Sequence, residues 1–256
     1  MPAPCFVWYE LTTTEPDAAV EFYKRVLGVQ ANDASAPGGP RYQALLAAGG
    51  PVGGVTSFPP DLGPEVAVPG WTGYVAVDDV DALAARVLAA GGKLRRPPTD
   101  IPGVGRFAVV ADPQGAGFNL FTPLPASVPP GREPGAAGTV GWHELMTAGW
   151  QDAFEFYSGL FGWGRGESFE MGPMGTYQLF TVDGVPSGGM MDKPAELPAA
   201  TWRYYFQVET VDAAAQRIEA AGGRIVMPAH QVPGGTWIVQ ALDPQGASFA
   251  VMSLAR

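Results

Sequence analysis

The sequence predicts an α+β fold built by duplication, and three observations support this. Residues 8–28 and 142–162 match without a gap, at a constant separation of 134 positions. The tetrapeptide Asp-Pro-Gln-Gly recurs at residues 112–115 and 243–246, which lie 131 positions apart. Strand-favouring runs flank each segment with helical periodicity. Because self-similarity at a fixed separation marks an internal repeat, we expect two homologous halves, each with two modules of strand, helix and further strands.

The first module begins with a strand and a helix. Residues 6–11 alternate in polarity and are rich in aromatic side chains, which is typical of a strand. Thr14 is predicted to be the N-cap of the helix, with Pro16 in its first turn, and Gly28 is predicted to end it. The apolar residues at helical spacing form one face: Ala19, Phe22, Tyr23, Val26 and Leu27.

Two strands at residues 42–47 and 52–58 complete the first module, with a turn at Gly49 and Gly50. The second module begins with a strand at residues 71–77. Asp78 and Asp79 are predicted to cap its helix, and Gly91 and Gly92 to stop it. The predicted apolar face of this helix comprises Val80, Leu83, Ala84, Val87 and Leu88.

Strands around Leu94 and at residues 105–111 and 118–122 close the first half. The Asp-Pro-Gln-Gly turn precedes the last of them, since Pro presets φ and Gly supplies a positive φ. We therefore predict domains at residues 1–124 and 139–256, joined by a Pro/Gly-rich linker at 125–138. The pattern leaves open whether each half closes its own sheet or modules of different halves pair.

Composition and charge narrow the class of protein. The 256 residues are 46% hydrophobic and 16% charged, as in a compact globular protein. A net charge of −10 argues against nucleic acid or an anionic membrane as partner. Cys5 is the single cysteine, and neither a signal peptide nor a membrane-spanning apolar run is recognisable. We expect a cytoplasmic protein that is a monomer or a loose homodimer.

Two motifs carry a family resemblance. Each first helix ends in the pattern F-Y-x-x-x-(L/F)-G, at residues 22–28 and 156–162, and each half ends in D-P-x-G followed by a strand. This resembles the glyoxalase/bleomycin-resistance/extradiol dioxygenase superfamily, also called vicinal oxygen chelate. The doubled W-x-E-L and the Pro-rich middle resemble two-domain glyoxalase-like proteins of bacteria. The resemblance implies βαβββ modules whose sheets curl into an open half-barrel, with helices outside and a ligand cavity inside.

The resemblance also implies where metal ligands would lie. Metal-binding members place His, Gln or Glu on the first strand of each module, and Glu seven residues after the Asp of the last turn. The corresponding residues here are Trp8, Thr72, Asn119, Trp142, Arg203 and Ala250. None of these is a usual ligand of a first-row transition metal, so we expect no metal and no other cofactor.

Only two histidines are present. His143 alternates with Trp142 and Glu144 along its predicted strand, so we expect it to face the helices in a structural role. His230 lies in the segment P-A-H-Q-V-P, which we interpret as a solvated loop; a loop over the cavity mouth is the alternative.

Trp8 shares a strand face with Glu10, and Trp142 shares the equivalent face with Glu144. One interpretation is an aromatic wall with one anion, suited to a cationic or planar ligand. The alternative is a filled barrel in which Glu pairs with an Arg such as Arg106 or Arg203. Further candidate ligand-binding residues follow the same parity: Tyr74, Asn119, Phe121, Arg203, Tyr205 and Met252.

Three functional hypotheses remain. The first is a metal-independent protein that binds or sequesters an aromatic or cationic small molecule in an aromatic-lined cavity. The second is a glyoxalase-related lyase, isomerase or dioxygenase-like enzyme, with a divergent metal site or with Glu10 or Glu144 as general base. The third is an interaction module whose cavities are packed shut.

Overall fold

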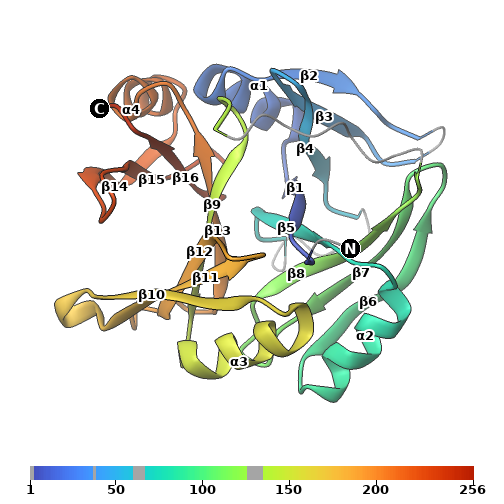
Figure 1. Cartoon of the computed structure of the whole chain (residues 1–256). Coiled ribbons are helices and arrows are strands. Elements are labelled where there is room, and N and C mark those ends of the chain that lie inside the picture. The colour runs from blue at the N-terminus through green and yellow to red at the C-terminus, as the bar shows by residue number, and fades with distance from the viewer. Residues whose placement is uncertain (1–2, 37–38, 60–66, 126–134) are drawn as a thin grey trace. The chain divides into compact units, whose positions relative to one another are not determined.

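The computed structural model describes residues 3–36, 39–59, 67–125 and 135–256 (Figure 1). Most of the predicted linker at 125–138 lies outside these residues. Among the described residues, no helix has the length and apolar character needed to cross a bilayer.

The first half contains two βαβββ modules. The first comprises β1 (Phe6–Thr13), α1 (Pro16–Leu27), β2 (Gln30–Asp33), β3 (Tyr42–Ala47) and β4 (Gly50–Ser57). The second comprises β5 (Gly70–Ala76), α2 (Val80–Ala89), β6 (Lys93–Ile101), β7 (Gly105–Ala111) and β8 (Gly117–Pro123). The predicted order of strand, helix and further strands is confirmed in both modules.

The second half repeats this order. Its first module comprises β9 (Val140–Thr147), α3 (Trp150–Phe161), β10 (Gly164–Glu170), the 3-10 turn η2 (Gly172–Met174), β11 (Thr176–Val182) and β12 (Val185–Asp192). Its second module comprises β13 (Thr201–Gln207), α4 (Val211–Ala220), β14 (Arg224–Gln231), β15 (Trp237–Leu242) and β16 (Ser248–Ser253). The duplicated α+β architecture is therefore present along both halves.

Hydrogen bonding arranges the strands in two open eight-stranded sheets, one for each half. Their orders are β2-β3-β4-β1-β5-β8-β7-β6 and β10-β11-β12-β9-β13-β16-β15-β14. Within a module the first strand pairs in parallel with the last, as β1 does with β4 and β5 with β8, while the others pair antiparallel. Helices pack on their own module's strands; α2, for example, lies on β6, β7 and β8 (Figure 1).

The chain packs as two compact units, and each unit takes one module from each half. The first contains residues 1–7, 72–128 and 142–203, so α2 and α3 belong to it together. The second contains residues 8–71, 129–141 and 204–256, with α1 and α4. The sequence left open whether the modules of one half pair with each other or with those of the other half. The hydrogen-bonded strand order keeps each half in its own sheet, whereas each compact unit combines one module from each half.

Helix ends follow the predicted chemistry with one exception. Glu15, not Thr14, is the N-cap residue of α1, and no side chain makes a capping bond there, so the Thr14 prediction is wrong. Pro16 supplies the first turn, where a missing N–H costs nothing. Gly28 ends the helix at φ 72°, a conformation that glycine adopts readily.

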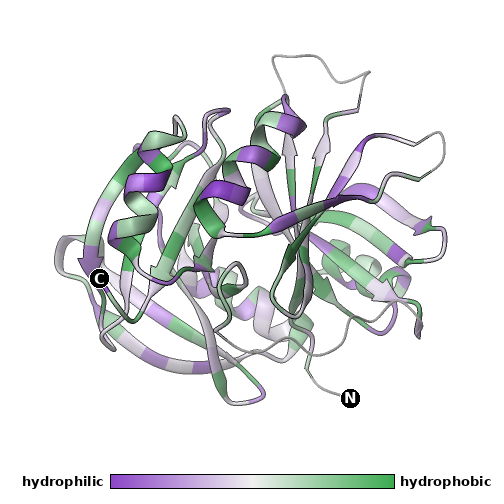
Figure 2. Ribbon diagram, turned by 90° about the horizontal axis from the view of Figure 1, so that it is seen from above, coloured by the Kyte–Doolittle hydropathy of each residue, from purple (hydrophilic) through white to green (hydrophobic). Residues whose placement is uncertain are grey.

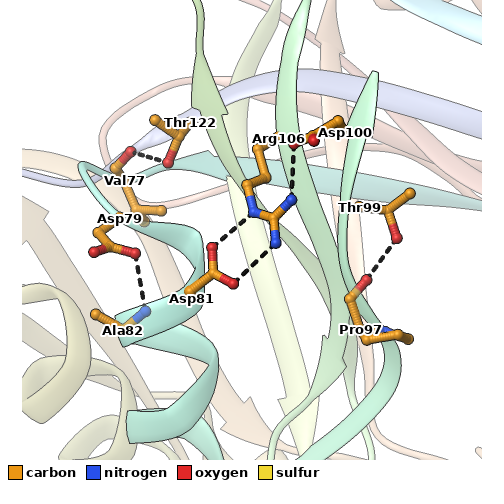
Figure 3. Close-up of polar contacts among 9 residues, drawn as sticks. All are labelled: Val77, Asp79, Asp81, Ala82, Pro97, Thr99, Asp100, Arg106 and Thr122. Carbon is orange, nitrogen blue, oxygen red and sulfur yellow. Dashed lines mark hydrogen bonds and ion pairs between the residues drawn. The ribbon is translucent and has the colours of Figure 1, made fainter. Parts of the chain in front are cut away.

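The cap predicted for α2 is confirmed. The Asp79 side chain accepts a hydrogen bond from Ala82 N at 2.9 Å (Figure 3). The predicted apolar face of this helix is right except at Leu88, whose side chain is 49% exposed. Hydrophilic bands alternate with hydrophobic ones along the helices, as expected of helices buried on one side (Figure 2).

Each unit contains a fully buried tyrosine from the first helix of one half, Tyr23 of α1 in the second unit and Tyr157 of α3 in the first. In the second unit, Trp71 Nε1 donates to Tyr23 Oη at 2.9 Å, and Tyr23 Oη donates to Asp243 at 3.0 Å. Asp243 begins an Asp-Pro-Gln-Gly turn and also accepts from Ala247 N at 2.8 Å. The repeated turn therefore does more than reverse the chain, because its carboxylate joins modules from the two halves.

The first unit repeats this chain of hydrogen bonds. Trp202 Nε1 donates to Tyr157 Oη at 3.0 Å, and Tyr157 Oη donates to Asp112 at 3.1 Å. Burial is the main cause that raises the pKa of both aspartates, Asp112 here and Asp243 in the second unit. The hydrogen bonds that each aspartate accepts from tyrosine and from backbone N–H groups lower its pKa.

Candidate functional site

The first candidate cluster lies on β1 and β3 in the second unit. Tyr9 and Leu11 are buried in the core, and Trp8 and Glu10 alternate with them, so these two share the other face as predicted. Trp8 Nε1 donates to Tyr42 Oη at 3.0 Å, and the Tyr42 hydroxyl is also hydrogen-bonded to Glu10. Burial, followed by the nearby charge of Glu10, holds the pKa of Tyr42 well above its ordinary value of 10.0. The phenol is therefore neutral at physiological pH.

A glycine on the neighbouring strand makes room for this phenol. Gly54 lies opposite Ala44 in the β3–β4 register, and a Cβ added to Gly54 would lie 2.1 Å from Tyr42 Oη. A Cβ on Gly53 would lie 2.4 Å from the carbonyl oxygen of Tyr9 on β1. The repeated Gly-Gly pair thus serves two close approaches, one to a tyrosine ring and one to a strand backbone.

The second cluster, in the first unit, repeats this arrangement. Trp142 Nε1 donates to Tyr177 Oη at 2.8 Å, and a Cβ on Gly189 would lie 2.3 Å from the Tyr177 ring. Glu144 is buried and forms an ion pair with Arg203 at 3.2 Å. The pairing of Glu144 with Arg203, one of our two interpretations, is confirmed. We call these two sets, Trp8–Tyr42–Glu10 and Trp142–Tyr177–Glu144, the Trp–Tyr–Glu clusters.

Arg106 does not take the equivalent role for Glu10. Its guanidinium lies 2.7 Å from Asp81 of α2 and 2.8 Å from Asp100 of β6 (Figure 3). These bonds raise the pKa of Arg106 beyond its already high ordinary value. The suggested Arg106–Glu10 pair is therefore wrong, because two exposed carboxylates hold this arginine on its own module. The residue at the position of Arg203 in the first half is Thr72.

A second group of predicted site residues gathers on β5, β7 and β8 in the first unit. Tyr74 lies 6.2 Å from Phe107 and 6.1 Å from Phe121 between ring centroids, and we call these three rings the aromatic corner. Asn119 pairs with Tyr74 in the β5–β8 register, so both side chains lie on the same face. Asn119 is 3% exposed, and its Oδ1 atom has no hydrogen-bond partner. Phe107 was missed by sequence reasoning, although it opposes Phe121 in the β7–β8 register.

The counterpart of this group in the second unit is internally bonded. Tyr205 Oη accepts a hydrogen bond from Gln240 Nε2 at 2.9 Å. Ala250 pairs with Tyr205 at the position that Asn119 occupies in the first half, and Met252 follows it, half-buried, on the same strand. The predicted residues Tyr205 and Met252 thus lie on one strand pair, together with Gln240, which sequence reasoning did not single out.

Neither histidine lies in these groups. His143 stacks on Phe6 at 4.5 Å, and its Nδ1 lies 2.7 Å from the carbonyl oxygen of Ser187, which can only accept. Nδ1 therefore carries a proton, and burial lowers the pKa of the imidazole to about 4, consistent with a structural role. His230 lies in β14 and not in a loop, so that prediction is wrong. Its Nδ1 lies 3.1 Å from the carbonyl oxygen of Pro228.

A surface hollow that the sequence did not predict lies between α2 and α3 in the first unit. It is lined by both apolar and charged residues: Arg86, Ala89, Ala90, Glu155, Phe156, Gly159 and Leu160. Arg86 crosses it and donates to the carbonyl oxygen of Gly159 at 2.7 Å. No predicted site residue lines it.

Residues 6–120 and 139–251 each match the Glyoxalase/Bleomycin resistance protein/Dioxygenase superfamily. The chain belongs to this superfamily. It is 32% identical over 254 residues to "Putative glyoxylase CFP32" of Mycobacterium bovis, covering 97% of this chain and 94% of that protein. It is 32% identical over 259 residues to the anthracycline biosynthesis protein DnrV of Streptomyces peucetius, with 96% and 92% covered.

The fold of this superfamily member is also that of a solved glyoxalase. The Mn(II)-bound glyoxalase from Novosphingobium aromaticivorans matches with a TM-score of 0.66 at 19% identity. The match covers 100% of this chain and 83% of that one. At this identity the likeness shows the fold alone, and a fold does not fix the chemistry of its site.

The residues present do not fit a transition metal at the positions that superfamily members use. The indoles of Trp8 and Trp142 fill the first-strand positions, and an indole N–H is a donor that cannot ligate a metal. Arg203 is occupied by its ion pair with Glu144. Within the described ranges, no group of three His, Cys, Asp or Glu side chains is placed to hold a metal ion. These positions therefore do not supply the ligand set that a transition metal needs.

Proposed function

We propose that this protein binds a planar aromatic or cationic small molecule without a metal. The observation that carries the proposal is the replacement of first-strand metal ligands by Trp8 and Trp142 within two Trp–Tyr–Glu clusters. The first cluster joins an indole, a neutral phenol and the carboxylate of Glu10 on strands of one module. Such a combination offers an aromatic face together with an anionic acceptor, which suits cation–π contact and stacking. In the second cluster the carboxylate of Glu144 is already paired with Arg203.

The relatives support a planar ligand class. One relative is named for anthracycline biosynthesis, and anthracyclines are fused-ring compounds with a cationic amino sugar. The hydrogen bond from Trp8 to Tyr42 fixes the orientation of the indole, so little side-chain entropy remains to be lost on binding. Glu10 is half-buried beside that phenol, where a ligand cation would be partly desolvated.

Fluorescence titration with daunorubicin tests the proposal. The protein is stripped with a chelator and titrated with and without added Mn²⁺, Zn²⁺ or Ni²⁺. We expect saturable binding that none of these ions changes. Glu10→Gln should weaken binding of the cationic compound about tenfold, equivalent to roughly 1.4 kcal/mol. The control Glu196→Gln removes the same charge from an exposed position and should leave the affinity unchanged. Binding that requires a metal ion would refute the proposal.

A second candidate function is supported by one difference between the clusters. The charge of Glu144 is paired with Arg203, whereas the corresponding first-half residue is Thr72. Glu10, which is hydrogen-bonded to the Tyr42 phenol, is then our candidate for a general base in a glyoxalase-related proton transfer. The assay is turnover of the hemithioacetal of methylglyoxal with a thiol by metal-free protein. Turnover that Glu10→Gln abolishes and Glu144→Gln retains would favour the enzyme over the binding protein.

A further inference from the structure

Among the described residues, five buried side-chain atoms lack a hydrogen-bond partner, and four of them occur in pairs related by the repeat. The hydroxyls of Thr13 and Thr147 form one pair, and the amide oxygens of Gln114 and Gln245 form the other. The two threonines lie 134 positions apart and the two glutamines 131, the separations at which the halves repeat. Their occurrence in both halves indicates a common feature of the fold. The fifth atom, Asn119 Oδ1, has Ala250 as its counterpart and therefore occurs once.

Asn119 lies among apolar and aromatic residues of its sheet face. It pairs with Tyr74 on β5 and with Val109 on β7, and Phe121 follows two residues later on the same face. A buried amide oxygen without a donor is costly, and native proteins retain few of them. At the equivalent place in the second half, the polar pair is complete: Gln240 donates to Tyr205. In the first half, the buried amide oxygen of Asn119 lies on the face of the aromatic corner, and no group of the described residues donates a hydrogen bond to it.

We propose that Asn119 Oδ1 accepts a hydrogen bond from an N–H or O–H group of the ligand, whose planar ring packs in the aromatic corner. This inference rests on the proposed function and adds to it a site and a ligand requirement: a hydrogen-bond donor on an aromatic ring. Tyr74 and Phe121 meet nearly edge to face, with an interplanar angle of 88°, an arrangement into which another ring can pack. Because Oδ1 is buried in the free protein, the proposal requires a neighbouring side chain to move when the ligand binds. Phe121 is the half-buried ring on the same strand face.

The guanidinium of Arg96 adds a second feature to this place. It lies 4.8 Å from the centre of the Phe107 ring, on the exposed strand β6. A cation over one ring of the aromatic corner favours an electron-rich aromatic ligand, such as a phenol, over a cationic one. The ligand class expected here is therefore a phenol or a similar hydroxylated aromatic ring.

The experiment compares 2-naphthol with 2-methoxynaphthalene, two planar rings that differ in the donor hydrogen, by isothermal titration. The wild-type protein should bind 2-naphthol about fivefold more tightly, the factor expected of one net hydrogen bond. Asn119→Leu, which keeps the volume and removes the acceptor, should bring the ratio to about one. Gln240→Leu removes an amide that is already bonded within the protein, so this variant should keep the wild-type ratio.

A stability measurement without ligand separates this role from a structural one. If Asn119 is kept for binding, Asn119→Leu removes an unpaired buried acceptor and should leave the melting temperature unchanged or raise it by about 2–4 °C. A fall in melting temperature would overturn the inference, because Asn119 would then be satisfied within the fold. Equal wild-type affinity for the two naphthalenes would also overturn it while leaving the proposed function standing. A wild-type protein that binds neither compound nor daunorubicin would overturn both.

Discussion

Removing the hydroxyl of Tyr23 tests the chain of hydrogen bonds at the centre of the second unit. In Tyr23→Phe, Trp71 Nε1 loses the acceptor that lies 2.9 Å away, and Asp243 loses a donor at 3.0 Å. An unsatisfied buried donor costs about 1–3 kcal/mol. Asp243 keeps its backbone donors Ala247 N and Gln245 N, so the loss of the hydrogen bond from Tyr23 to Asp243 adds about 1 kcal/mol. We expect Tyr23→Phe to reduce the free energy of unfolding by about 2–4 kcal/mol.

Urea unfolding followed by tryptophan fluorescence measures this loss, and its pH dependence tests the cause. Burial raises the pKa of Asp243 above the ordinary value of 3.8, whereas the bond from Tyr23 lowers it. Without that bond, the folded-state pKa rises further. The native state then holds a proton that the unfolded state releases, so stability falls as pH rises from 3.8 through the folded-state pKa.

The loss in Tyr23→Phe should therefore be larger at pH 7 than at pH 4. Tyr157→Phe is the matched variant in the first unit and should behave alike, because Tyr157 bonds Trp202 and Asp112 in the same way. A change of less than about 0.5 kcal/mol in both variants, the scatter of ordinary surface substitutions, would refute the reasoning.

Three further predictions concern single side chains. Gly54→Ala should cost about 1–3 kcal/mol in urea unfolding, because its Cβ would meet the Tyr42 hydroxyl at 2.1 Å; unchanged stability would contradict this contact. Arg203→Met should cost about 3 kcal/mol by leaving Glu144 buried without its ion pair, and adding Glu144→Gln should restore part of the loss. The His143 imidazole should titrate near pH 4 by NMR, because burial lowers its pKa from 6.5 to about 4. The neutral imidazole should stabilise the folded protein fully above pH 6.5, and this stabilisation should be lost as the pH falls toward 4. Titration near pH 6.5 would instead mean that the side chain is exposed to water.

Most of the fold could be predicted because the repeat removes ambiguity. A strand or helix that is weak in one half is supported by its counterpart at the same separation. The errors are local. Thr14 has the chemistry of a cap, but the N-cap position falls one residue later, at Glu15, where no side chain makes the capping bond. His230 was placed in a loop because prolines flank it, yet β14 is the last strand of its sheet, and an edge strand tolerates proline.

The site was less predictable, since strand parity gives the face of a residue but not its partner. Trp8 and Glu10 were expected on one face, and they are, but Tyr42 was not expected to bond them. A signal existed: Tyr42 and Gly54 both recur in the second half at a separation of 135. Which carboxylate meets which arginine depends on the register between strands, and the sequence could not give this.

The duplication itself provides a criterion for separating structural from functional residues. Both halves share the Trp–Tyr–Asp chains and the Trp–Tyr–Glu clusters, so each of these features is compatible with a role in holding any such module together. Where equivalent positions of the two halves hold different residues, the shared fold does not explain the difference, and such positions are candidates for a functional role. Arg203 against Thr72 and Asn119 against Ala250 are two such positions, and both lie on the faces that carry the predicted site residues. A ligand bound at the aromatic corner should therefore occupy one half only, and Asn119→Leu should weaken its binding.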